Sequence, residues 1–148
     1  MTAMTASNAI GQALASHLQA LPVALLARIC LVGMFPFSAI DKFVNRSEAL
    51  AQARSSIVPA ALAPLLLAMG AVLEIVAPVC IVVGWMAEPA ALLLALFCIL
   101  TALLFHPFWA SGDLLSKGPS VGRNHFWDFT KNFGLAGGLL LVAMGQGF

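Results

Sequence analysis

Four long apolar runs, separated by short polar segments, dominate the chain. They cover about residues 21–43, 62–83, 89–109 and 126–144. Each run is close to the roughly 20 residues that an α-helix needs to cross the hydrocarbon core of a bilayer. Inside lipid, a helix satisfies its backbone hydrogen bonds within its own segment. The pattern therefore predicts an all-α integral membrane protein, built as a four-helix antiparallel bundle.

Residues 1–20 stand apart from these runs because they are small and weakly polar. Ile10, Leu14 and Leu18 recur every four residues, which is compatible with a short interfacial helix. The same composition is equally compatible with disorder. We expect a short N-terminal segment of one of these two kinds over residues 1–20, followed by one four-span domain over residues 21–148.

The composition supports lipid as the main solvent and limits the chemistry. The chain is 61% hydrophobic and 9% charged, whereas a soluble domain carries about 25% charged residues. Its net charge of +1 gives no electrostatic case for nucleic acid. Cys30, Cys80 and Cys98 lie in three different runs with no CxxC pair. With no nucleotide-binding motif either, we expect no metal and no nucleotide.

The basic residues predict an orientation in the membrane. Four spans place both termini on one side, and five cations lie in or beside the first and last connecting loops: Lys42, Arg46, Arg54, Lys117 and Arg123. Short cytoplasmic loops carry an excess of Lys and Arg. We therefore expect the two longer loops in the cytoplasm and both termini outside.

Arg28, Glu74 and Lys131 are ionisable residues inside the predicted spans, where such groups normally pair and face the bundle. Arg28 and Glu74 lie at similar depths by the helical rise of 1.5 Å per residue, so we expect an ion pair between them. Glu74 with Lys131, which lies shallower, is the competing pair. Either pair serves only to fix helix register, or the carboxylate forms part of a proton or ligand site.

A second polar group is expected at the cytoplasmic ends of three spans. It consists of Lys42, His106, Trp109, His125, Lys131 and Asn132. Donors beside aromatic rings suit a quinone, whose ring is apolar and whose carbonyls accept hydrogen bonds. The alternative is an ordinary interfacial belt of Trp anchors and snorkelling Lys side chains. His106 also lies on a stripe with Ala95 and Ala102 that is expected to face the bundle, together with Trp109.

Several short motifs, in this order and spacing, resemble the DoxX family of small bacterial membrane proteins over about residues 27–142. The motifs are Arg28 with Gly33, Ser38–Lys42, Gly70–Glu74, Leu103–Trp109, Asn124-His125, Phe129, Lys131-Asn132 and Gly137-Gly138. The chain departs from the family's usual Ser-Gly at Ser38-Ala39, and from its usual Gly-Gly at Ala77-Pro78. The second departure lies one turn beyond Glu74 and alters the packing there.

The resemblance implies a four-helix protein of the bacterial inner membrane. Relatives include the quinone-reducing membrane subunit of a thiosulfate:quinone oxidoreductase, and a protein thought to assemble with superoxide dismutase and a sulfurtransferase. The first hypothesis is therefore a membrane subunit of a redox system that binds a quinone and works with an oxidoreductase partner. The second is a non-catalytic scaffold that anchors soluble partners. The third is a small-solute or proton pathway centred on Glu74.

Overall fold

The computed structural model describes residues 11–12, 21–55 and 59–145, and every regular element in these ranges is a helix. Most of the N-terminal segment expected over residues 1–20 lies outside the described residues. The helices follow the chain as α2 (Leu21–Val32), α3 (Met34–Val44), α4 (Arg46–Ser55), η1 (Ala60–Leu62), α5 (Ala63–Val83), α6 (Ala87–Phe105), η2 (Phe108–Ala110) and α7 (Val121–Ala143).

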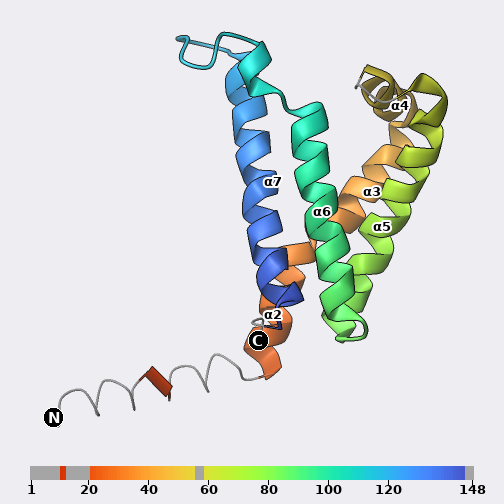
Figure 1. Ribbon diagram of the computed structural model, residues 1–148, viewed down its shortest axis with the longest axis vertical. Helices are drawn as coiled ribbons and strands as arrows, with labels where there is room; N and C mark the ends of the chain where they lie inside the picture. The colour runs from red at the N-terminus through yellow and green to blue at the C-terminus, as the bar shows by residue number, and fades with distance from the viewer. Residues whose placement is uncertain (1–10, 13–20, 56–58, 146–148) are drawn as a thin grey trace, which may run out of the picture.

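The first apolar run forms one candidate span, Val23–Val44, in which a turn at Gly33 separates α2 from α3. α2 ends at Val32 and α3 begins at Met34, with Gly33 between them. The Gly33 N–H still donates to the Ile29 carbonyl, with an N···O distance of 2.8 Å. Pro36, however, has no N–H to donate to the carbonyl of Val32, four residues earlier. α3 consequently leans away from the line of α2 (Figure 1).

Length and apolarity identify three membrane spans in the described part of the chain: Val23–Val44, Ala60–Val83 and Ala87–Ala110. An all-α membrane protein is therefore confirmed. α7 has 23 residues and is long enough for a fourth crossing. The charged residues in its first half, however, make it less apolar than the three spans. The fourth crossing stays a prediction.

The helices form two pairs that meet at one end and lean apart at the other (Figure 1). α6 and α7 run side by side, and α3 packs against α5. Gly84, with φ of 80°, and Met86, with φ of 53°, make the tight turn from α5 to α6. α4 and the long α6–α7 connection lie at the end where the pairs lean apart, as Figure 1 shows.

Small side chains fill much of the core and let the helices approach closely. On α6, Ala91, Ala95, Cys98 and Ala102 are buried, and α5 runs unbroken through the buried Ala77-Pro78. The stripe expected to face the bundle is confirmed at Ala95 and Ala102. It is wrong at Trp109, which is 58% exposed.

Candidate functional site

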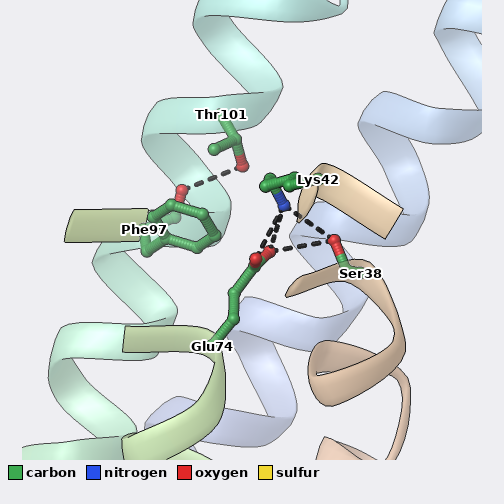
Figure 2. Close-up of polar contacts among 5 residues, drawn as sticks. All are labelled: Ser38, Lys42, Glu74, Phe97 and Thr101. Carbon is green, nitrogen blue, oxygen red and sulfur yellow. Dashed lines mark hydrogen bonds and ion pairs between the residues drawn. The ribbon is translucent and has the colours of Figure 1, made fainter. Parts of the chain in front are cut away.

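Glu74 is the central polar group of the interior. It lies in the middle of α5 and is only 3% exposed. The Lys42 ammonium lies 2.7 Å from each carboxylate oxygen. Ser38 donates from its hydroxyl to Glu74 Oε1 at 3.0 Å and accepts from Lys42 at 2.8 Å. The three side chains form a closed triad (Figure 2).

Helical spacing explains why α3 supplies two members of this triad. Ser38 and Lys42 are four residues apart, so they lie one above the other on one face of α3. The Lys42 ammonium has three N–H groups and finds three oxygen acceptors within the triad. The charges are thereby paired and hydrogen-bonded, as a buried ion pair requires.

α6 supplies the neighbouring wall of the triad (Figure 2). Gly70 makes room for the Phe97 ring, because a Cβ at Gly70 would lie 3.2 Å from it. Thr101 donates to the carbonyls of Phe97 and Cys98, at 2.9 and 3.0 Å, within its own helix. The α6 wall therefore presents an aromatic ring and a hydroxyl that is already bonded.

The ionic partner of Glu74 is Lys42, and not the Arg28 predicted from depth along the helices. Arg28 Nη1 donates to the Ile81 carbonyl at 3.3 Å, seven residues beyond Glu74, and lies beside Gly84. Seven residues correspond to about 10 Å along a helix. The long side chain reaches toward the α5–α6 turn, where a cavity of about 430 Å³ is lined by Arg28 and Glu88 among others.

Lys131, the competing partner, also lies elsewhere. Its ammonium pairs with Asp128 on the same helix at 3.2 Å, and the two side chains are 70% and 44% exposed. Asn132 donates from its amide to the Asp128 carbonyl at 2.9 Å. Neither residue contacts the triad, so α7 contributes nothing to the pairing of Glu74.

Two histidines meet where α6 ends and α7 begins. His106 follows the last residue of α6, and His125 lies in the second turn of α7. Their Nδ1 atoms are 3.4 Å apart, and both side chains are half-buried. If both rings are neutral, one Nδ1–H donates to the other Nδ1. The pair then presents one Nε2–H donor and one Nε2 lone pair.

A cluster of aromatic rings from η2 and α7 includes the neighbours of these histidines in the sequence, such as Phe108 and Phe126. The Phe108 centroid lies 5.1 Å from Trp109, 5.3 Å from Phe126 and 5.2 Å from Phe129, all edge to face. Trp109 was among the residues predicted to form the pocket, whereas the three phenylalanines were not. The spacing of Phe126 and Phe129, which puts them on one face of a helix, was the available signal.

The six residues predicted to share one pocket therefore fall into two places. Lys42 belongs to the Glu74 triad. His106, His125 and Trp109 belong to the histidine pair and its aromatic rings, while Lys131 and Asn132 bond to Asp128 one turn away. Among the described residues, no hydrogen bond or ring contact joins Lys42 to the other five.

Outside the membrane, Asp113 holds the start of α7. Its carboxylate accepts from the backbone N–H groups of Gly122 and Val121, at 2.7 and 2.9 Å. Ser120 caps the same helix by accepting from the Arg123 N–H at 3.0 Å. The Gly122 hydrogen bond, followed by that of Val121, lowers the pKa of Asp113 below its ordinary value of 3.8. This cap fixes the helix that carries His125.

A smaller cavity, of about 220 Å³, lies between α3, α4 and α5. Its lining is mainly apolar and includes Lys42 and Arg46 as its two charged residues. Lys42 thus faces the triad with its ammonium while its side chain contributes to the cavity wall. The cavity lies beside Glu74's partner, away from the histidine pair.

Comparisons with known proteins agree with the fold. The model of the DoxX family matches residues 23–107, which reach from α2 to just beyond His106. The chain is 32% identical over 122 residues to the inner membrane protein YphA of Escherichia coli strain K12, covering 81% of this chain and 80% of that protein. No solved structure is significantly similar to this chain.

Proposed function

Because the chain belongs to the DoxX family, as a multi-pass protein of the bacterial inner membrane, we propose that it is the membrane subunit of a redox system and binds a quinone. The head group binds at the His106–His125 pair, next to the cluster of aromatic rings from η2 and α7. The observation that carries this proposal is the 3.4 Å contact between the two Nδ1 atoms beside these rings.

The chemistry of the pair fits a quinone. A quinone ring is apolar and stacks on aromatic side chains, while its carbonyl oxygens accept hydrogen bonds. Reduction to the quinol takes up two electrons and two protons. The Nε2–H of one histidine donates to a carbonyl, and histidine exchanges protons near neutral pH. The electrons come from an oxidoreductase partner.

Quenching of tryptophan fluorescence tests this proposal directly. Trp109 and Trp127 lie on the proposed site's side, whereas Trp85 lies in the α5–α6 turn at the other end. A Trp85→Phe background therefore confines the signal to the proposed site. We expect a short-tail ubiquinone analogue to quench the purified protein in nanodiscs saturably. Absence of saturable quenching would contradict quinone binding at this end.

Histidine variants locate the site. His106→Phe and His125→Phe keep a ring but remove its nitrogens, so we expect roughly tenfold weaker binding for the loss of one hydrogen bond. His17→Phe makes the same change at the third histidine of the chain and serves as the matched control. Equal affinities for all three variants would place the quinone elsewhere.

A proton pathway centred on Glu74 is a second candidate, supported by the buried Lys42–Glu74–Ser38 triad. Ionisable groups inside a membrane often serve proton transfer. We expect proton uptake into liposomes to fall in Glu74→Gln and to persist in Asp128→Asn, whose carboxyl is exposed on α7. Uptake unchanged by Glu74→Gln would remove this candidate.

The scaffold hypothesis rests on α4, which buries no residue and carries the exposed Arg46 and Arg54. An acidic soluble partner would bind these side chains by charge complementarity. Arg54→Glu should then abolish capture of that partner by the purified protein. Capture that survives the charge reversal would count against a scaffold role for α4.

A further inference from the structure

The cavity between α3, α4 and α5 has an unusual lining for a membrane protein interior. Two cations, Lys42 and Arg46, contribute to it together with six apolar residues, and no carboxylate lines it. Its volume of about 220 Å³ corresponds to about seven waters at roughly 30 Å³ each. A small anionic group with an apolar continuation matches this combination of charge, size and wall.

The two cations differ in their availability. The Lys42 ammonium is occupied by Glu74 and Ser38. Arg46 is exposed and has no acceptor or acidic partner among the described residues. Arg46 is therefore the cation that can receive a ligand, and its planar guanidinium suits the paired oxygens of a phosphate.

The cavity lies at the ends of two candidate membrane spans, Val23–Val44 and Ala60–Val83. It is lined where α3 ends, by Phe43, and where α5 begins, by Pro64. Phe43 is 65% exposed, and Leu65 and Met69 on α5 are also exposed to the surroundings. An acyl chain leaving the cavity therefore meets an apolar helix surface. Basic pockets between membrane helices bind anionic lipid head groups in this way.

We propose that this cavity binds the phosphate head group of an anionic phospholipid, with Arg46 contacting the phosphate and the acyl chains lying along α3 and α5. The site is independent of the quinone proposed at the histidine pair, because the two lie on different helix pairs. Lys42 keeps its partners in the triad and supplies one wall.

Native mass spectrometry of the full-length protein tests this site. We expect dioctanoyl phosphatidylglycerol to bind more tightly than dioctanoyl phosphatidylcholine, because the second has no net charge. Arg46→Gln should weaken phosphatidylglycerol binding roughly five- to tenfold. Arg54→Gln makes the same change on the same helix, outside the cavity lining, and should keep wild-type binding.

A second variant, Ala68→Leu, tests the cavity without changing any charge. Ala68 lines the cavity and is exposed, so Ala68→Leu fills the space without burying a polar group and should also weaken binding. The proposal would be overturned by equal loss in Arg46→Gln and Arg54→Gln, by equal binding of both lipids, or by unchanged binding in Ala68→Leu. Displacement of the lipid by inorganic phosphate at equal concentration would overturn it in favour of a free-phosphate site.

Discussion

At the scale of single residues, the interior is defined by which cation reaches Glu74. A buried carboxylate requires both a counter-charge and hydrogen-bond donors. Lys42 supplies the charge, and Ser38, one turn earlier on α3, supplies a further donor. Arg28 reaches the end of α5 and bonds a backbone carbonyl there. The triad therefore ties α3 to α5 whatever else it does.

Removing the charge of Glu74 tests how much the triad contributes to stability. Glu74→Gln should destabilise the protein by about 2–4 kcal/mol, because the Lys42 ammonium loses its buried partner. The cost is at the lower end because the Lys42 side chain is 25% exposed and can turn toward the cavity. Unfolding by heat or by SDS in mixed micelles measures the change.

The double variant Lys42→Met/Glu74→Gln provides the control for this loss. With both charges removed, no buried charge is left unpaired, so we expect the double variant to be more stable than Glu74→Gln alone. Simple addition of the two single effects would contradict a direct interaction between Lys42 and Glu74.

At the scale of elements, two local devices place the helices that carry the candidate sites. The turn at Gly33 and the missing N–H of Pro36 let α3 lean away from α2, and Ser38 and Lys42 lie against α5. The Asp113 carboxylate and the Ser120 hydroxyl cap the start of α7 and so position His125 beside His106. Both the α2–α3 turn and the α7 cap are formed by residues that lie close together in the sequence.

Alanine at the α2–α3 break should destabilise the protein. A Cβ at Gly33 would lie 2.8 Å from the Ile29 carbonyl oxygen, a backbone atom. We expect a loss of about 1–3 kcal/mol from this crowding. Gly134→Ala is the matched control, since no atom lies within 4 Å of its added Cβ. Thermal unfolding that is equal in the two variants would contradict the strained approach at Gly33.

The Asp113 cap predicts an acid-sensitive start of α7. Because folding lowers the pKa of Asp113, its carboxylate stabilises the folded loop at pH above the ordinary value of 3.8. That contribution is lost as the pH falls through the lowered pKa. Hydrogen exchange at the Val121 and Gly122 amides should accelerate relative to the rest of α7 in this range. Asp113→Ala should abolish the acid-dependent part, and an unchanged profile would contradict the cap.

At the scale of the whole molecule, the helix pairs separate the two candidate sites. The Glu74 triad lies between α3 and α5, and the smaller cavity lies between α3, α4 and α5, whereas the histidine pair belongs to α6 and α7. Both longer connections lie at the end where the pairs lean apart (Figure 1). The five basic residues in or beside these connections are therefore gathered at one end of the molecule.

This arrangement predicts the membrane topology. In a variant whose cysteines are replaced by alanine, Ser47→Cys and Ser116→Cys should react with an impermeant maleimide only after the cells are opened, because their basic loops face the cytoplasm. Met86→Cys, in the α5–α6 turn, should react in intact cells once the outer membrane is permeabilised. Labelling of Ser47→Cys and Ser116→Cys from opposite sides would contradict an even number of crossings between them.

The sequence predicted the elements better than their contacts. The apolar runs located α5 and α6 closely, because membrane helices follow from length and apolarity. The turn at Gly33 was not predicted, and the α7 helix begins at Val121, five residues before the last apolar run. These boundaries depend on single backbone hydrogen bonds and helix caps. The average apolarity of a segment does not reveal them.

The sequence by itself determined the class of protein, its family and four candidate functional residues. Glu74, Lys42, His106 and His125 were identified from their place in or beside the apolar runs. Only the tertiary structure decided which of them meet. Depth along an ideal helix favoured Arg28 as the partner of Glu74, but pairing also depends on helix rotation, the direction of each side chain and its reach. Those quantities are set when α3 packs on α5.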